Sequence, residues 1–250
     1  MIEAAAARTI VEVGVRDGAT SRALLEYAQG AGAVVHGIDP APDPAVQDLV
    51  DRHPRRFVFH RALSLDALPQ INGVDCALID GDHNWYTVLN ELRLLAGQSD
   101  EGSLFPLTFA HDVGWPYGRR DLYYAPETIP EEYRQPHRRA GLVPGHPELQ
   151  DEAGLSPGLC HAETEGGPRN GVLTALQDFV AESARPLTLK VVHGFAGLGI
   201  LVDREHVRRN AALAETLAQL DSPAFLRQQC RRLEAARNRL RARLVTQPAR

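Results

Sequence analysis

Residues 8–39 hold the feature that most limits what this chain can fold into: a strand pattern, a glycine turn, a helix and a second strand. Residues 9–15 form a β-branched apolar run, and a turn through Gly18 precedes a helical pattern. A second apolar run at 33–38 ends at Asp39. In doubly wound α/β sheets, an acid at that place accepts hydrogen bonds from a ribose, while the glycine turn lets a ligand approach the backbone. The pattern therefore favours an adenosine-containing cofactor.

The spacing of the glycines distinguishes between cofactors. A dinucleotide fingerprint reads G-x-G-x-x-G, and its second glycine makes room for a pyrophosphate. Here only Gly14 and Gly18 are present, and the strand carries Glu12. A carboxylate beside the ligand disfavours a pyrophosphate but suits a cationic ligand, such as a sulfonium with an amino-acid tail. The alternative is an α/β protein that has the same strand, turn and helix without a cofactor.

The composition is that of one globular α/β domain. The chain has 250 residues, of which 44% are hydrophobic and 24% charged, enough for a sizeable core. Its net charge of -5 gives no reason to expect a nucleic-acid partner, and its three widely spaced cysteines suggest neither a disulfide framework nor a thiolate zinc site. We expect a soluble, cytoplasmic protein without a membrane partner, because the sequence shows no signal-type segment and no run of about eighteen apolar residues.

Further strand patterns extend the predicted sheet. The run at 57–64 predicts a third strand, and Ser64 at its end can either cap a turn or line an adenine pocket. A fourth strand is predicted at 74–79, followed by a helix at 85–95, and a fifth strand at 107–110. After a helix at 170–180, apolar runs at 187–193 and 198–202 are separated by only four residues. A parallel crossover needs a dozen or more residues, so these two strands must be antiparallel.

Carboxylates and imidazoles follow the fourth and fifth predicted strands. These residues are Asp80, Asp82 and His83 after the fourth strand, and His111 and Asp112 after the fifth. Doubly wound folds bind ligands at the carboxyl ends of their strands, so the five side chains should converge there. Such a set suits either a hard divalent cation held by oxygens or a general base beside an orienting acid. The alternative is that the aspartates cap turns and the histidines are solvated loop residues.

Residues 115–170 have no steady period and are rich in proline, glycine, aromatic residues and arginine. A segment of this length without regular structure is usually a functional lid or disordered, and its aromatic content favours a lid over the site. The candidates for contact with an acceptor are Trp115, Tyr117, Tyr123 and Tyr124, which can stack on it, and Arg119, which can hold anionic or hydroxyl-rich groups.

With these motifs the chain resembles the class I S-adenosylmethionine-dependent methyltransferases, most closely the macrocin-type sugar O-methyltransferases and more distantly the catechol-type ones. The resemblance covers residues 8–114 and 170–204 and includes E-x-G-x-x-x-G-x-x-S at 12–21 and I-D-G-D-H at 79–83. It implies a Rossmann-like, doubly wound seven-stranded α/β sheet with an antiparallel terminal strand, and S-adenosyl-L-methionine as the cofactor. The cofactor-binding residues that it implies are Glu12, Gly14, Gly18, Ser21, Asp39, Ser64 and Asp80.

The resemblance also implies a reaction, the in-line transfer of a methyl group to a hydroxyl oxygen of a small molecule such as a sugar or another natural-product intermediate. The catalytic candidates are His83, His111 and Asp112, because an imidazole titrates near neutral pH and an acid can orient it. In metal-dependent relatives the corresponding positions ligate magnesium, which gives Asp80, His111 and Asp112 as the metal candidates. Histidine is a poor ligand for a hard cation, so a requirement for Mg²⁺ stays open.

Two other functions stay open at this point. The same domain serves methyltransferases that act on peptide or protein carboxylates or side chains, which differ in the lid. A non-catalytic protein that binds S-adenosylmethionine would also show the cofactor motifs.

The sequence predicts a cofactor-binding domain at 1–204, with the lid at 115–170, and a C-terminal helical extension at 205–250. In the extension, Leu226, Leu233 and Leu240 recur every seven residues among many arginines. Because the heptad pattern is short, two arrangements stay open: the helix packs on its own domain, or it joins two copies in a homodimer.

Overall fold

The computed structural model describes residues 1–98, 103–151 and 153–246, and it contains one large sheet of seven strands. The strand order is β3-β2-β1-β4-β5-β10-β9. The strands are β1 (Thr9–Val13), β2 (Val34–Ile38), β3 (Phe57–His60), β4 (Cys76–Ile79), β5 (Leu107–His111), β9 (Leu187–Val192) and β10 (Leu198–Asp203). The chain therefore has the predicted Rossmann-like, doubly wound α/β fold.

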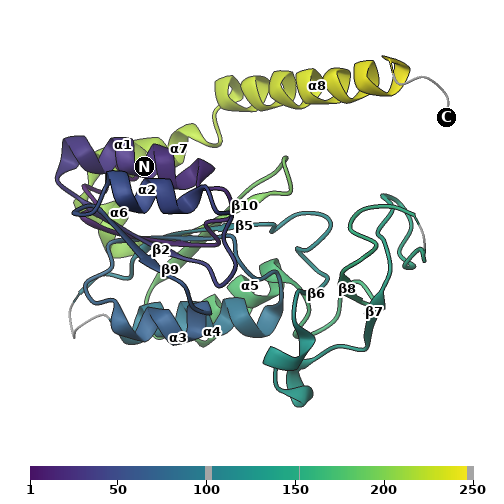
Figure 1. Ribbon diagram of the computed structural model, residues 1–250. Coiled ribbons are helices and arrows are strands. Elements are labelled where there is room, and N and C mark those ends of the chain that lie inside the picture. The colour runs from purple at the N-terminus through teal and green to yellow at the C-terminus, as the bar shows by residue number, and fades with distance from the viewer. Residues whose placement is uncertain (99–102, 152, 247–250) are drawn as a thin grey trace.

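Helices cover both faces of this sheet (Figure 1). On one face lie α1 (Ala19–Ala31), α2 (Val46–Arg52) and α7 (Ala211–Gln219), and on the other α3 (Ser64–Ala67), α4 (Trp85–Gly97) and α5 (Val172–Glu182). The apolar residues of the helices and strands form a core on each face, as in the packing of Leu24 and Leu25 of α1 against Ile10 and Val35. This layering leaves the carboxyl ends of the parallel strands uncovered by helices.

The C-terminal hairpin confirms the prediction of an antiparallel strand. Strand β10 pairs antiparallel with both of its neighbours, β5 and β9. It is the last strand in the sequence but lies inside the sheet, so the edge strand β9 runs parallel to β1–β5. The register places Leu198 opposite His111, which brings the start of β10 beside the functional end of β5.

The third strand is shorter than predicted. It ends at His60, which pairs with Ile38 at the end of β2, and Ser64 instead begins the short helix α3. Strand β3 lies at the edge of the sheet, and its one neighbour, β2, ends at Ile38. The chain beyond His60 therefore has no strand to pair with.

Residues 115–170 contain regular structure that the sequence pattern did not indicate. A small antiparallel sheet of order β6-β8-β7 is formed by β6 (Leu122–Tyr123), β7 (His137–Arg139) and β8 (Cys160–Ala162). Two 3₁₀ turns, η2 (Pro126–Thr128) and η3 (Glu131–Tyr133), connect β6 to β7. The segment lies beyond the carboxyl end of the large sheet (Figure 1).

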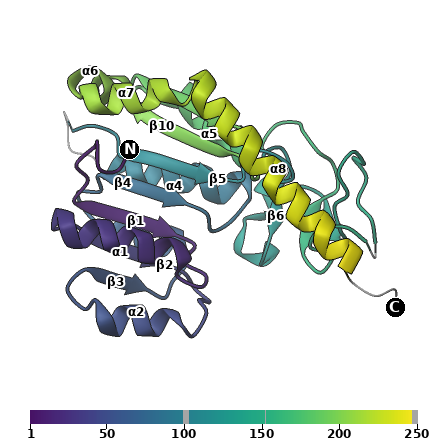
Figure 2. The same cartoon turned by 90° about the horizontal axis from the view of Figure 1, so that it is seen from above.

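The predicted helical extension consists of three helices. Helix α6 (Arg204–Arg209) and helix α7 stay on the body, where Leu213 of α7 is fully buried, whereas α8 (Pro223–Thr246) extends beyond it (Figures 1 and 2). Residues 247–250 of the predicted extension lie outside the described residues. None of the described helices combines the length and the apolar composition that are needed to cross a bilayer.

Gly14 follows β1 at a point where the backbones of two strands nearly touch. Its φ is +87°, and a Cβ atom on it would lie 2.3 Å from the carbonyl oxygen of Asp80, which follows β4. A φ in this range is strained for residues with a side chain, and here the obstacle is backbone that cannot rotate away. Glycine is therefore required for β1 and β4 to end side by side.

We expect Gly14→Ala to destabilise the protein by about 2–4 kcal/mol, since it combines backbone strain with a steric clash. The matched control is Gly30→Ala in α1, where a Cβ atom meets nothing within 4 Å. Alanine inside a helix should stabilise the protein there by about 0.5–1 kcal/mol. Urea unfolding followed by circular dichroism measures both, and a Gly14→Ala variant as stable as the wild type would contradict the backbone contact.

Candidate functional site

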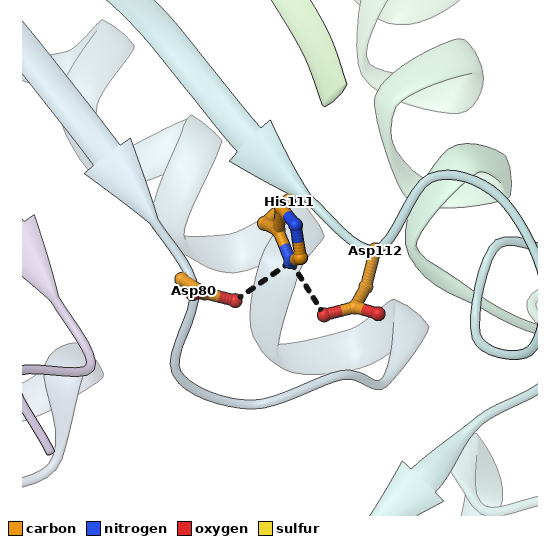
Figure 3. Close-up of side chains that lie close together, drawn as sticks. All are labelled: Asp80, His111 and Asp112. Atoms are coloured by element: carbon orange, nitrogen blue, oxygen red, sulfur yellow. Dashed lines mark hydrogen bonds and ion pairs between the residues drawn. The ribbon is translucent and has the colours of Figure 1, made fainter. Parts of the chain in front are cut away.

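Two carboxylates and two imidazoles meet at the carboxyl ends of β4 and β5. Asp80, His111 and Asp112 point toward one another from these two strand ends (Figure 3). The His111 Nδ1 atom lies 2.9 Å from Asp112 Oδ2 and 3.3 Å from Asp80 Oδ1. From the β4–α4 loop, His83 places its Nε2 atom 2.8 Å from Asp112 Oδ2 and 3.6 Å from Asp80 Oδ1. Four of the five predicted polar residues thus form one cluster.

The fifth residue, Asp82, faces helix α4 instead. Its Oδ2 atom accepts a hydrogen bond from the Thr87 hydroxyl at 3.1 Å. Its neighbour Asn84 caps α4 by accepting from the Thr87 backbone N–H at 2.8 Å. The cap of α4 is therefore Asn84, and Asp82 bonds only a side chain in the first turn of that helix.

The carboxylates of the cluster hold both imidazoles in the protonated form. Burial alone would lower the pKa of His83, but hydrogen bonds to Asp112 and Asp80 raise it to about 9. A hydrogen bond to Asp112, followed by one to Asp80, raises the pKa of His111 to about 10. In this state neither imidazole accepts a proton near neutral pH. For His83 or His111 to act as a base, a bound group must first separate it from the carboxylates.

Asp112 is the central acceptor of the cluster. Burial alone would raise its pKa, but hydrogen bonds from His111 and His83 lower it well below the usual range. Its backbone adopts φ +61°, a left-handed conformation that few residues other than glycine adopt, although aspartate tolerates it better than most. This conformation turns the Asp112 carboxylate back toward Asp80 beyond the end of β5.

Glu12 lies in the core beside the opening glycine turn. It is 2% exposed, and its Oε2 atom accepts a hydrogen bond from the hydroxyl of Ser21 in α1. Its Oε1 atom is buried and has no hydrogen-bond partner among the described residues. Burial, and to a lesser extent the charges of Asp80 and Asp39, raise the pKa of Glu12 to about 7, against the lowering effect of Ser21. A buried acceptor without a donor is the feature that a cationic ligand would complete.

Asp39 holds the backbone of the glycine turn through hydrogen bonds. Its carboxylate accepts hydrogen bonds from the backbone N–H groups of Arg16 and Ala41, each at 2.8 Å. Each oxygen of a carboxylate has two lone pairs, so Asp39 keeps acceptor capacity for a ribose. Gly18 caps α1 in the left-handed conformation, with φ +75°. Asp39 is close enough to Glu12 for its charge to raise the pKa of Glu12.

Ser64 is nearly buried at the start of α3. It lies beside Glu91 of α4, a fully buried acid whose pKa is raised to about 8 by burial. No sequence signal identified Glu91, because its position falls within an ordinary amphipathic helix pattern.

Aromatic side chains from the 115–170 segment line the cluster. The Tyr117 and Tyr124 rings lie 5.2 Å and 5.9 Å from the His83 ring, and Tyr124 and Trp115 are 53% and 41% exposed. Tyr123, by contrast, is buried: its hydroxyl donates to Asp121 and accepts from the backbone N–H of Gln135. Of these two predicted tyrosines, Tyr124 is therefore exposed beside the cluster, whereas Tyr123 is buried.

Arg119, predicted to contact the acceptor, instead joins the segment to helix α5. Its two terminal nitrogens donate to the Thr174 hydroxyl at 3.0 Å and to the Gln177 side-chain oxygen at 2.7 Å.

The fully buried carboxylate of Asp121 joins the segment to both α4 and α5. It accepts from the first backbone N–H of α4, at Trp85, and from Gly171 at the start of α5, both at 2.7 Å. A helix start leaves such N–H groups without intrahelical partners, so one side chain satisfies two helices. Burial raises the pKa of Asp121 to about 6 despite these hydrogen bonds. No sequence signal identified this role, since a lone aspartate after two arginines is an ordinary surface pattern.

The cluster also offers a set of metal-binding atoms. One ligand atom each from Asp80, His111 and Asp112 lie within 4.8 Å of one another. The set combines two carboxylates with one imidazole, and such mixed oxygen and nitrogen donors suit Mn²⁺, Fe²⁺ or Zn²⁺ better than Mg²⁺.

A comparison with protein families finds a match to the N-terminal part of the chain. A family model described as a methyltransferase domain matches residues 11–113. This range begins in β1, ends directly after β5 and includes Glu12, Asp39 and the whole cluster of carboxylates and imidazoles. A search of curated proteins found no match to the chain.

Solved structures show a more general likeness. An SAH-bound methyltransferase from Podospora anserina is 15% identical, with a TM-score of 0.49 over 79% of this chain and 72% of the other. The 1,6-didemethyltoxoflavin N1-methyltransferase from Burkholderia thailandensis is 18% identical, with a TM-score of 0.41 over 79% and 69%. An O-methyltransferase family protein from the same organism is 12% identical, with a TM-score of 0.44 over 81% and 55%. Likeness at this level does not identify the acceptor.

The unpartnered carboxylate of Glu12 should make stability depend on pH. Its pKa is raised from 4.5 to about 7, so the folded state favours the neutral form, and the resulting stability is full below pH 4.5 and lost as the pH rises through 7. We expect Glu12→Gln to be stabilised relative to the wild type above pH 7, by about 3 kcal/mol at most, and to match it below pH 4.5.

Thermal unfolding across this pH range, without added ligand, measures the difference. Glu26→Gln on the exposed face of α1 serves as the control and should differ little from the wild type at every pH. A pH-independent difference for Glu12→Gln would show that the buried carboxylate is not the cause.

Asp121 supplies acceptor atoms, so alanine and asparagine should have different effects there. We expect Asp121→Ala to cost about 2–6 kcal/mol, because two buried N–H groups lose their acceptor at about 1–3 kcal/mol each. Asp121→Asn keeps one oxygen for both groups and should cost much less. Hydrogen exchange at residues 122–140 and urea unfolding measure the effects, and equal damage by both substitutions would indicate that the charge is required instead.

Proposed function

Since the chain carries a class I S-adenosylmethionine-dependent methyltransferase domain, we propose that it transfers the methyl group to a hydroxyl oxygen of a small molecule. The observation that carries the proposal is the cluster of two carboxylates and two imidazoles beside the proposed cofactor-binding residues. An alkylated nitrogen needs little help to lose its proton, whereas a hydroxyl acceptor needs a group that removes or stabilises the proton. The aromatic side chains around the cluster suit a small organic acceptor.

The residues around the glycine turn fit the cofactor. The unpartnered Oε1 atom of Glu12 can accept from the ammonium of the methionine tail, and Asp39 keeps acceptor capacity for the ribose hydroxyls. The backbone of Gly14 to Gly18 lies between them, with Ser21 orienting Glu12, and Ser64 and Asp80 complete the proposed set. S-adenosylmethionine, when bound, supplies an intrinsically reactive sulfonium methyl group. The protein's part is then to align the acceptor and to move its proton.

Within the cluster we assign proton transfer to Asp112 and the two histidines. Asp112 orients both imidazoles through short contacts to His83 Nε2 and His111 Nδ1. An acceptor hydroxyl that binds between the carboxylates and one imidazole would replace the hydrogen bonds between them. Without those hydrogen bonds the pKa of that imidazole falls, and the imidazole can act as a base near neutral pH. Trp115, Tyr117 and Tyr124 position the acceptor.

A divalent cation fits the same cluster and would act on the same proton. Asp80, His111 and Asp112 would hold it, and it would lower the pKa of a bound hydroxyl. His83, in contact with Asp112, would orient that ligand from outside, as partners of metal ligands commonly do. Because one of the three ligand atoms is an imidazole nitrogen, we propose Mn²⁺ or Fe²⁺ in preference to Mg²⁺.

Asp112→Asn tests this assignment, with Asp82→Asn as the matched control because Asp82 faces α4. We expect Asp112→Asn to reduce methyl transfer about 100-fold or more, while calorimetry shows nearly unchanged binding of S-adenosylmethionine. The assay follows S-adenosylhomocysteine formation with small phenols, sugars and amines, before and after chelation and with Mn²⁺ or Mg²⁺ restored.

Three results would contradict the proposal. Methylation of the amines alone would rule out a hydroxyl acceptor. Full activity of Asp112→Asn would rule out a catalytic role for the cluster. Binding of NAD in place of S-adenosylmethionine would contradict the proposed cofactor.

A further inference from the structure

Helix α8 stands largely apart from the rest of the described chain (Figures 1 and 2). None of its described side chains, residues 223–243, is buried. A helix of 24 residues that buries no apolar face has little stability of its own in water. A surface outside this copy of the chain is therefore needed to cover it.

Helix α8 carries an exposed stripe of leucines on one side. Leu226, Leu233 and Leu240 lie on one side of the helix and are 54%, 40% and 60% exposed. Leu233 packs against Gly194 in the loop between β9 and β10, next to Phe195, which is 49% exposed. The leucine stripe thus contacts its own body at Leu233 and continues past this contact to Leu240.

The charge of α8 indicates which kind of surface can cover it. Residues 223–246 contain seven arginines and one glutamate, a net charge of +6, whereas the whole chain carries -5. The rest of the chain therefore carries -11. Two α8 helices side by side would bring their like charges together, which disfavours a coiled coil of α8 with its own copy. An acidic surface is the complement of this helix.

Residues 124–133, which include η2 and η3, form an acidic turn that fits this description. The turn contains three exposed glutamates and no basic residue, and in the described part of the chain these glutamates form no ion pair; they are Glu127, Glu131 and Glu132. The turn begins at Tyr124, which is 53% exposed. It therefore offers both negative charge and an apolar contact for the leucine stripe.

The acidic turn and α8 of one chain lie on opposite faces of the large sheet. The ring of Tyr133 in the turn lies 4.9 Å from the ring of Tyr86 of α4, and α4 lies on the face away from α1 and α7. In Figure 1 the teal turn lies below the sheet and α8 runs above it, both toward the carboxyl ends of the strands. A twofold axis at this end would bring each α8 to the turn of a second copy.

We propose that α8 is an exchanged arm, which docks on the acidic turn at 124–133 of a second copy and so forms a twofold dimer. Its arginines face the glutamates of the other copy, and its leucines cover Tyr124. Because the Tyr124 ring lies 5.9 Å from the ring of His83, the arm of one copy closes the acceptor side of the other copy's site. The dimer contact itself goes beyond the proposed function and does not depend on it, whereas closure of the acceptor side rests on that function.

Charge reversal on either side, followed by mixing, tests the arrangement in the full-length chain by sedimentation velocity. Arg232 and Arg239 directly precede two leucines of the stripe, and Glu131 and Glu132 lie in the turn. We expect R232E/R239E and E131R/E132R each to raise the dimer dissociation constant about tenfold or more. An equimolar mixture of the two variants should restore the dimer, because both contacts become complementary again.

The control R22E/R55E changes two exposed arginines that belong neither to α8 nor to the acidic turn, and it should leave the dimer intact. Raising the salt to about 1 M, where the Debye length is about 3 Å, should weaken the wild-type dimer. A wild-type chain that sediments as a monomer would overturn the proposal, as would a dimer that both reversals leave unchanged. Capture of RNA by α8, with a monomer left after nuclease treatment, would overturn it in favour of a nucleic-acid partner.

Discussion

The backbone contact between Gly14 and Asp80 determines where the functional groups of this protein lie. At this point β1 and β4 end so close together that a Cβ atom on Gly14 would lie 2.3 Å from the Asp80 carbonyl oxygen. Glu12 precedes this contact on β1, and the Asp80 side chain extends from its other side. The proposed cofactor-binding and catalytic residues thus share one short stretch of backbone, so any shift between the two strands would change both.

The same region contains two buried acids, Asp112 and Glu12, and they differ in the partners that offset the cost of burying a charge. Asp112 is nearly buried but has two imidazoles beside it, and their hydrogen bonds keep it ionised and both rings protonated. Glu12 is as deeply buried, yet only the Ser21 hydroxyl offsets the cost, and its pKa is raised to about 7. A carboxylate with its counter-charges in place is stable in the free protein, whereas one without them is suited to a cationic ligand.

The 115–170 segment depends on a third buried acid. Asp121 holds the first turns of α4 and α5 with one carboxylate, and Arg119 adds contacts along α5. Through the pairing of His83 with Leu122, the segment is also joined to the loop that carries the cluster. The aromatic side chains beside His83 are therefore held on a braced framework rather than on a free loop, which suits the positioning of a small acceptor.

Local sequence determined much of this protein. The β-branched runs, the glycine turn and the four-residue loop between β9 and β10 predicted the sheet, its antiparallel strand and the meeting of Asp80, His83, His111 and Asp112, because strand ends in such folds share one edge. Only the tertiary structure decided which side chains of the long segment are exposed, since Tyr123 and Tyr124 are equivalent in sequence and only packing buries the first. It likewise decided that Ser64 begins a helix, that Asp82 accepts from the Thr87 side chain of α4 and that Asp121 joins two helices. Each of these roles depends on a partner distant in sequence or on the end of a neighbouring strand, and local periodicity contains no information about either.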